Sequence, residues 1–254
     1  MRKSNWQKKI RNLKFNLNNF QDTDNPSIFA NWNPYKYGLL YQYQFIQYYI
    51  NKNPNIKTWI NKYKKNYNDN APGIFFNSKV KISYDNLISY EEYSFLKKHR
   101  LLIKDKDVIE IGSGYGRTCE MIIKEFHPRS YTIIDLDKVV NFSKTYLKKN
   151  LNKKDFSKIK FYTFENIYNF EKSFSLLINI DSFHEMEKPI IRFYYDKFRN
   201  IPNFFIKNTV ARYHPSDLIN HKINKNTKIP KIFEEIGLMN EVINIYDEKQ
   251  IMKQ

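Results

Sequence analysis

From Leu101 onward, short apolar runs alternate along the chain with amphipathic stretches. Unbroken apolar runs of this length predict buried strands, and apolar residues at helical spacing predict helices that cover them. We expect strands at 107–111, 130–135, 158–163, 175–180 and 203–208, with helices at 117–126, 137–149 and 189–199. This alternation predicts an α/β fold, a Rossmann-like, doubly wound and mostly parallel sheet.

The first hundred residues follow a different pattern, rich in asparagine and in aromatic residues. We expect helices at 35–50, 56–67 and 86–99 and a strand or extended piece at 74–82. An aromatic stripe of this kind is typical of a core, although such residues also stack bases or sugars. The chain therefore divides into an N-terminal helical cap, 1–100, and a second domain, 101–254, whose tail carries a helix at 230–236 and a strand-like piece at 241–246.

Composition narrows the class of protein. With 254 residues, 41% of them hydrophobic, the chain is long enough for one α/β domain and an addition to it. A single cysteine, Cys119, excludes a disulfide framework and a cysteine-based zinc site. No run of 18 apolar residues follows the basic N-terminus or occurs elsewhere, so we expect a soluble cytoplasmic protein without a membrane span.

The formal net charge of +17 has two interpretations. Clustered lysine and arginine bind phosphates, which favours a nucleic-acid partner. Lysine, asparagine, isoleucine and tyrosine are abundant throughout, however, which is typical of an AT-rich coding bias. Under either interpretation, a basic surface attracts an anionic small-molecule or glycan acceptor over long distances.

The most informative stretch is 108–117, where an apolar run leads into Gly112, Gly114 and Gly116, three of the six glycines in the chain. Glycines just beyond a buried strand allow a sharp turn and a close approach of the backbone to a ligand. The spacing is GxGxG preceded by an acid, Glu110, and differs from the GxGxxG that surrounds a pyrophosphate. It predicts a cofactor without phosphates.

Asp135 ends the second expected strand, 23 positions after Gly112. In a doubly wound sheet this places a carboxylate beside the glycine turn, where it can accept hydrogen bonds from both hydroxyls of a ribose. Glu110, inside the motif, would face the amino group of a methionine moiety. Two carboxylates suit a positively charged sulfonium cofactor and do not suit a pyrophosphate.

Together, Glu110 with its three glycines and Asp135 resemble the first two motifs of the class I S-adenosylmethionine-dependent methyltransferases, over about 101–208. The resemblance implies S-adenosyl-L-methionine as cofactor and S-adenosyl-L-homocysteine as product. It implies these cofactor-binding residues: Glu110, Gly112, Ser113, Gly114, Gly116, Asp135, Leu136, Glu165 and Asp181. Glu165 would lie near the adenine, although it could equally cap the next segment.

The segment that follows the fourth strand, from Asp181 to Met186, narrows the resemblance. With the two motifs above, it is similar to sugar O-methyltransferases of bacterial surface-polysaccharide clusters, except that Asp137 replaces a usual proline. This resemblance implies methylation of a capsular or surface polysaccharide sugar, of its nucleotide-linked precursor, or of a phosphate or phosphoramidate decoration.

Methyl transfer to a hydroxyl requires alignment and removal of a proton, and histidine is the usual base. His184 is the leading candidate, with Glu185 or Asp181 orienting the imidazole or the acceptor. His214 is a second candidate base, and Tyr213 beside it is a candidate substrate contact.

Two further candidates for substrate contacts are Arg117 and Tyr115. Arg117 could bind an anionic acceptor or form a salt bridge. The carboxylates and imidazole of Asp181, Glu185 and His184 could also hold a divalent metal, but we expect no metal site.

The alternative function is an RNA methyltransferase. Methylation of an exocyclic adenine amine generally uses an Asn/Asp-Pro-Pro-Tyr-like run after the fourth strand, and this sequence has none. Cytosine C5 methylation needs a cysteine nucleophile there, but Cys119 lies in the helix after the glycines. A binding protein on a degenerate scaffold is disfavoured by the intact motifs.

Overall fold

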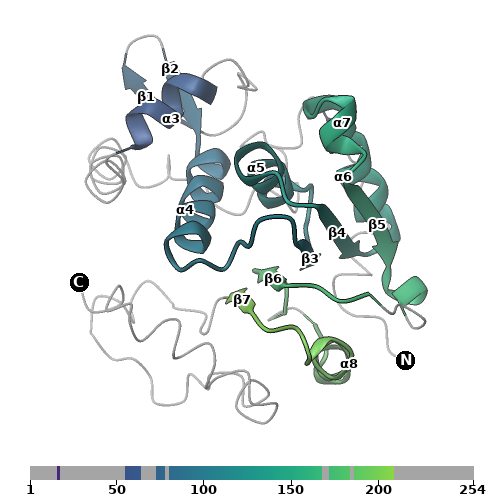
Figure 1. The fold of residues 1–254 in the computed structure, drawn as a ribbon. Helices are drawn as coiled ribbons and strands as arrows, with labels where there is room; N and C mark the ends of the chain where they lie inside the picture. Colours follow the sequence, from purple (N-terminus) through teal and green to yellow (C-terminus); the bar gives the residue numbers. More distant parts are fainter. Residues whose placement is uncertain are drawn as a thin grey trace, which may run out of the picture. The chain divides into compact units, whose positions relative to one another are not determined.

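The computed structural model describes residues 16–17, 55–63, 73–77, 80–167, 172–183 and 186–208 (Figure 1). These residues form two compact units that divide between Phe95 and Leu96, which we call the N-terminal unit and the sheet unit. The helix expected at 35–50 and the tail elements expected at 230–236 and 241–246 lie outside the described residues.

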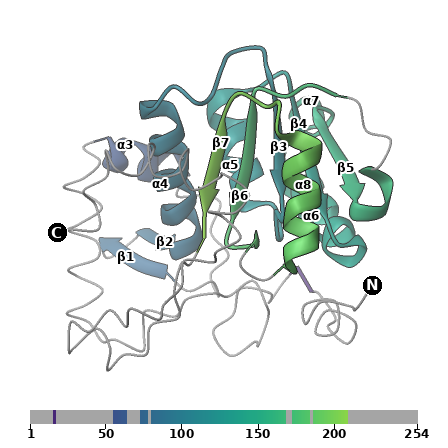
Figure 2. The ribbon, with the colours of Figure 1, turned by 90° about the horizontal axis from the view of Figure 1, so that it is seen from below.

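The sheet unit contains five parallel strands in the order β5-β4-β3-β6-β7. They are β3 (Asp107–Ile111), β4 (Ser130–Asp135), β5 (Ile159–Thr163), β6 (Leu176–Ile180) and β7 (Phe204–Lys207). The first strand of the sheet in sequence, β3, is the central one. The next two, β4 and β5, lie on one side of it, and β6 and β7 lie on the other side (Figure 2). The predicted doubly wound, parallel sheet is therefore confirmed.

Helices cover both faces of this sheet. They are α5 (Arg117–Phe126), α6 (Asp137–Asn150), the short α7 (Lys153–Phe156), the 3-10 turn η2 (Phe164–Ile167) and α8 (Lys188–Phe198). Figures 1 and 2 show α8 on one face and α5 with α6 on the other. All residues of β3 and β6 are buried because both faces are covered, which explains why most of their residues are apolar.

Alternate residues of the strands face the two layers. Ile109, Ile111 and Ile134 belong to a buried cluster with Tyr194 and Phe198 of α8. Successive side chains of a strand point to opposite faces, so the residues next to these three isoleucines in sequence face α5 and α6.

Two elements of the sheet unit are absent from the sequence prediction, α7 and η2. Each is a single turn of four residues, too short to show a helical repeat of apolar positions. The α7 turn begins because the side chain of Asn152 accepts a hydrogen bond from the Asp155 backbone N–H at 2.8 Å.

The N-terminal unit contains α3 (Ile56–Tyr63), β1 (Gly73–Asn77), β2 (Val80–Ser83) and most of α4 (Tyr84–Lys98). The helices match the prediction, and the rings of Trp59 and Tyr90 pack with centroids 4.6 Å apart. The strand or extended piece expected at 74–82 is extended in the described residues, but it consists of two strands, β1 and β2, that pair as an antiparallel hairpin. The described part is therefore not purely helical, and its role as a cap over the site stays a prediction.

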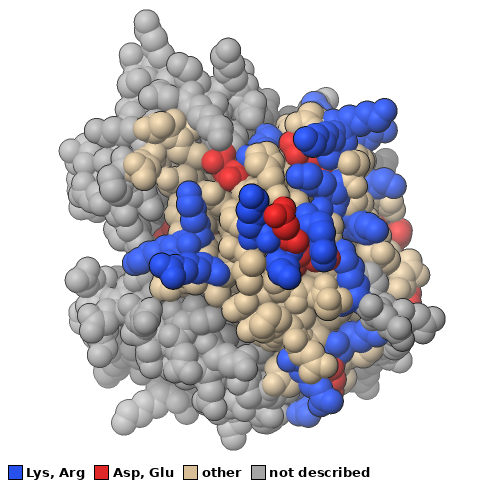
Figure 3. Space-filling model, viewed as in Figure 1, with Lys and Arg blue, Asp and Glu red and all other residues tan. Residues whose placement is uncertain are grey.

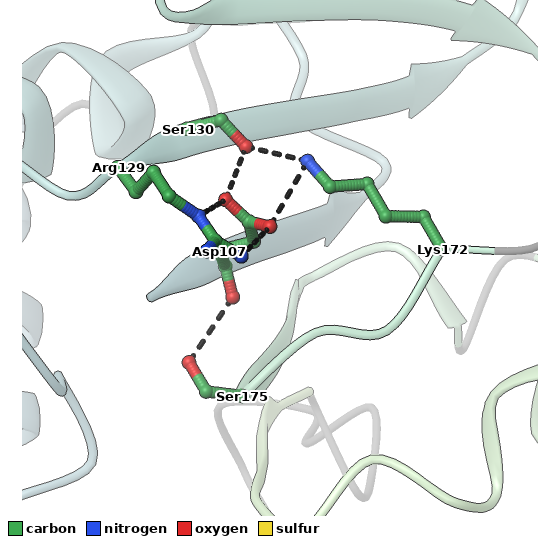
Figure 4. A network of polar contacts seen from close by, with 5 residues as sticks. All are labelled: Asp107, Arg129, Ser130, Lys172 and Ser175. Carbon is green, nitrogen blue, oxygen red and sulfur yellow. Dashed lines mark hydrogen bonds and ion pairs between the residues drawn. The ribbon is translucent and has the colours of Figure 1, made fainter. Parts of the chain in front are cut away.

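A network of polar side chains lies at the amino ends of the central strands (Figure 4). The Asp107 carboxylate accepts hydrogen bonds from Arg129 Nε at 3.0 Å, Arg129 Nη2 at 2.6 Å and Ser130 Oγ at 2.7 Å. Lys172 Nζ lies 3.2 Å from the same carboxylate, and Ser175 Oγ donates to the Asp107 carbonyl at 3.1 Å. The network therefore joins the starts of β3 and β4 to the segment that leads into β6.

Burial alone would raise the pKa of Asp107, but hydrogen bonds from Arg129, Ser130 and Lys172 outweigh it and hold the pKa well below its usual range. We expect Asp107→Asn to lower the free energy of unfolding by about 2 to 3 kcal/mol at pH 7, the scale of charge-assisted hydrogen bonds. A depressed carboxyl pKa stabilises the fold above about pH 4, and this contribution is lost as the pH falls below that value.

Urea denaturation at several pH values measures this effect. The difference between wild type and Asp107→Asn should shrink as the pH is lowered from about 4. Asp105→Asn is the matched control because Asp105 is exposed. Equal stabilities of the Asp107 variant and the wild type at pH 7 would contradict the prediction.

Candidate functional site

The candidate site begins with the glycine turn between β3 and α5. Gly112, Gly114 and Gly116 all have positive φ, at 75°, 56° and 97°. Residues with a side chain rarely adopt this conformation, so the turn requires glycine at these points. The Gly112 N–H donates to the Ile134 carbonyl at 2.8 Å, which fixes the turn against the end of β4.

Close contacts give two of these glycines a second role. A Cβ atom on Gly112 would lie 1.9 Å from Ser182 Oγ and 2.4 Å from Ser182 Cβ. A Cβ atom on Gly116 would lie 2.9 Å from Leu147 Cδ1 of α6. The missing side chains therefore allow both the loop after β6 and helix α6 to pack directly on the turn.

Asp135 ends β4 with its carboxylate beside the glycine turn. Its Oδ2 accepts from the Gly114 N–H at 3.0 Å, and its Oδ1 accepts from the Leu136 N–H at 2.7 Å. Burial raises the pKa of Asp135 to about 7, although backbone hydrogen bonds from Leu136, Gly114 and Ser113 act to lower it. Gly114 and Asp135 are 21 residues apart in sequence, yet this hydrogen bond joins the turn and the carboxylate into one structural unit.

The raised pKa predicts a pH-dependent affinity for a ligand whose hydroxyls donate to Asp135. Such a ligand binds the ionised carboxylate, so its Kd should rise about tenfold for each pH unit below 7 and stay constant above pH 8. The folded chain also keeps a proton that the unfolded chain releases near pH 4, so this group alone lowers stability as the pH rises from about 4 to 7.

Calorimetric titration with S-adenosylmethionine between pH 5.5 and 8.5 measures the effect on binding. Asp135→Asn is the control, since its affinity should not follow this profile. A wild-type Kd that is constant across the range would contradict the prediction.

Glu110 lies in the centre of the sheet unit with 1% of its surface exposed. Its Oε2 accepts a hydrogen bond from the Tyr131 hydroxyl of β4 at 2.9 Å. Both side chains point to the face covered by α5 and α6, because Ile109 and Ile111 face α8. This tyrosine, which the sequence analysis did not single out, thus fixes the orientation of the Glu110 carboxylate.

The loop after β6 reaches the same edge of the sheet. Asp181 has a φ of 50°, and its N–H donates to the Lys207 carbonyl at 2.7 Å. Phe183 is buried, with its ring stacked against Tyr194 at 6.2 Å. Because the strands are parallel, Asp135, the last residue of β4, and Asp181, the first residue after β6, lie at the carboxyl ends of the two strands that flank β3.

Four of the candidate catalytic and substrate-binding residues lie outside the described residues, namely His184, Glu185, Tyr213 and His214. Their roles stay predictions. Within the described ranges, no group of three or more His, Cys, Asp or Glu side chains could hold a metal ion. None of the helices in these ranges is long and apolar enough to cross a membrane.

The remaining predicted residues occupy three different settings. Arg117 is the half-buried first residue of α5, and Glu165 is exposed in η2 after β5. Tyr115 is 3% exposed, and its ring packs edge-on against Tyr146 of α6 with centroids 4.8 Å apart. This packing leaves little of Tyr115 for a substrate to contact.

Asn179 is a residue of this region that sequence reasoning missed. It is 0% exposed in β6, and its Nδ2 donates to the Ile111 carbonyl at 2.8 Å. Its Oδ1 accepts from the Phe183 N–H at 3.1 Å and from Asn208 Nδ2 at 2.8 Å. The signal that could have revealed it is one amide within an otherwise apolar run of strand residues.

Exposed basic side chains are numerous on the helices that follow β4. Figure 3 shows lysine and arginine side chains over α6 and α7. Four exposed lysines in this area are Lys148, Lys149, Lys153 and Lys154. Helix α6 starts just after Asp135 and runs back toward the start of β5, so these lysines lie near the amino ends of the strands. They do not line the glycine turn.

No protein-family model matches this sequence, and no curated protein matches it. Among solved structures, the methyltransferase domain of bacterial CtHen1-C is 16% identical with a TM-score of 0.39, and the match covers 46% of this chain and 60% of that chain. The glycopeptide N-methyltransferase MtfA, complexed with (S)-adenosyl-L-methionine, is 16% identical with a TM-score of 0.38, covering 44% of this chain and 49% of that chain.

A second bacterial Hen1 structure, CtHen1-CN, is 13% identical with a TM-score of 0.42, covering 63% of this chain and 83% of that chain. All three similar proteins are methyltransferases by name. The chain spans less than two thirds of CtHen1-C and about half of MtfA.

Proposed function

We propose that this chain is an S-adenosylmethionine-dependent O-methyltransferase whose acceptor is a surface or capsular glycan sugar, its nucleotide-linked precursor, or a phosphate or phosphoramidate decoration. The observation that carries the proposal is the pairing of Asp135 with the Gly114 N–H, beside a glycine turn that follows Glu110. Two carboxylates at such a turn favour a cationic, ribose-containing ligand and repel a pyrophosphate.

The residues fit this cofactor. Asp135 is half-buried and can accept hydrogen bonds from ribose hydroxyls. Gly114, whose N–H donates to Asp135, has no side chain that would keep the ligand from the backbone, and Gly112 lets Ser182 pack on the turn. Glu110 supplies negative charge for the ammonium group of the methionine moiety. Leu136 and Glu165 would lie on the adenine side. When bound, the cofactor supplies an electrophilic methyl group on a sulfonium sulfur.

The acceptor side of the proposal draws on the sequence. His184 would remove the proton from an acceptor hydroxyl, with Asp181 or Glu185 orienting the imidazole or the acceptor. His214 is the second candidate base. Arg117 and Tyr213 are the candidate contacts to an anionic acceptor. Arg117 is half-buried at the start of α5, so part of its side chain is accessible to such an acceptor.

Calorimetry with S-adenosylmethionine and with S-adenosylhomocysteine tests the cofactor assignment, and we expect both to bind. Mass-shift screening of nucleotide-sugars and capsule fragments then tests the acceptor, for which methylation adds one CH₂ unit. Failure of both cofactor forms to bind would remove the proposal.

His184→Ala separates the two kinds of acceptor oxygen. With a hydroxyl acceptor, loss of the base should lower the rate by about 10²-fold or more. An oxygen that is already ionised needs no base, so the rate would stay close to that of wild type. His127→Ala is the control because His127 follows α5, and 57% of its side chain is exposed. A wild-type rate on a sugar hydroxyl would refute His184 as the base.

The alternative, an RNA methyltransferase, is favoured by one observation, the exposed lysines at the end of α6 and in α7. RNA binding should then fall steeply with salt, and Lys153→Glu with Lys154→Glu should weaken it. Methyl incorporation into RNA would support this alternative. Absence of RNA binding at low salt would eliminate it.

A further inference from the structure

Asn179 occupies a position where an apolar residue would ordinarily stand. The other residues of β6 are leucine and isoleucine, and all five are buried between β3 and β7. Burying a carboxamide is unfavourable unless its polar atoms are hydrogen-bonded. The amide is therefore retained at a cost, which its three hydrogen bonds offset.

These three bonds reach the chain segments that surround the candidate site. The Ile111 carbonyl immediately precedes Gly112, and the bond to it spans 68 residues of sequence. Phe183 is the residue before His184, and its N–H donates to the same side chain. Asn208 follows β7 and donates to it as well. One amide thus joins the ends of three neighbouring strands, β3, β6 and β7.

The contact between Ser182 and Gly112 shows what this connection holds in place. The serine lies where a Cβ atom of residue 112 would stand, so the loop after β6 is pressed against the glycine turn. Asp181 adopts a φ of 50° in the same loop, a conformation that costs a non-glycine residue free energy. The bonds from Asn179 to both sides of this contact maintain it.

We infer that Asn179 is a positioning residue that holds the loop after β6 against the glycine turn and thereby sets the affinity for the cofactor. This inference rests on the proposed function. Asn179 acts through Gly112 and Ser182.

The test compares Asn179→Leu with Asn203→Leu. Asn203 is the matched control because it is also an asparagine that bridges β6 and β7, through a 3.0 Å bond from its Nδ2 to the Ser175 carbonyl, but at the opposite edge of the sheet. Melting temperatures and calorimetric titrations with S-adenosylmethionine are measured for both. We expect both variants to have lower melting temperatures than the wild type. Only Asn179→Leu should raise the Kd for S-adenosylmethionine, by about tenfold or more.

Asn208→Ala keeps the inference testable if Asn179→Leu does not fold. It removes one of the three hydrogen bonds, so it should raise the Kd about threefold, while Asn203→Ala leaves the Kd unchanged. An unchanged Kd in the Asn179 or Asn208 variant, with a wild type that binds the cofactor, would overturn the inference alone. A wild type that does not bind would overturn the proposed function together with it.

Discussion

Replacing Asp135 by Asn is expected to weaken S-adenosylmethionine binding by about 100-fold, because a charge-assisted hydrogen bond contributes about 1.5 to 3 kcal/mol. The carboxylate can receive both ribose hydroxyls, whereas an amide offers one acceptor oxygen. The amide nitrogen would also face a backbone N–H of Gly114 or Leu136, which now donates to the carboxylate. Calorimetry at pH 8, where the wild-type carboxyl is ionised, measures the loss.

Asp137→Asn provides the matched control for this experiment. Asp137 is exposed at the first position of α6, two residues after Asp135, and its replacement makes the same change in charge. We expect its Kd to stay within about twofold of wild type, since exposed charges interact weakly. A wild-type affinity in Asp135→Asn would refute the assignment of Asp135 to the ribose.

Gly112→Ala is expected to have the largest effect on the fold. Its methyl group would lie 1.9 Å from Ser182 Oγ, and the φ of 75° disfavours any side chain. Overpacking costs about 1 to 3 kcal/mol and a left-handed backbone about 1 to 2 kcal/mol more. We therefore expect a loss of about 3 kcal/mol in the free energy of unfolding, measured by urea denaturation, together with weaker cofactor binding.

A second substitution separates the two causes. In Gly112→Ala with Ser182→Gly, the clashing Oγ and Cβ atoms are gone, and the next atom, Asn179 Nδ2, lies 3.8 Å away, an ordinary contact. The double variant should regain the part of stability lost to overpacking and retain the cost of the left-handed backbone. If adding Ser182→Gly regains no stability, close approach of the loop is not the reason for a glycine at this position.

Some parts of the site could be predicted from the sequence, and others depend on partners that are distant in sequence. The juxtaposition of Asp135 with the glycine turn followed from the order of elements, because ligand-binding residues of a doubly wound sheet follow the carboxyl ends of its strands. Tyr131 and Asn179 did not follow, because each looks like an ordinary strand residue. Their importance lies in their partners, Glu110 and Ile111, which are 21 and 68 residues away.

What the sequence determined by itself is the parallel sheet and its helices, because β3, β4 and β6 are buried on both faces and therefore consist mostly of apolar residues. The tertiary structure decided the polar interior: the Asp107 network at one edge, and the contacts of Asn179 and Ser182 with the glycine turn at the other. The physical reason is that burial leaves a pattern of apolar residues along the chain. A side-chain hydrogen bond leaves none, since its partner is chosen by the packing of strands that are distant in sequence.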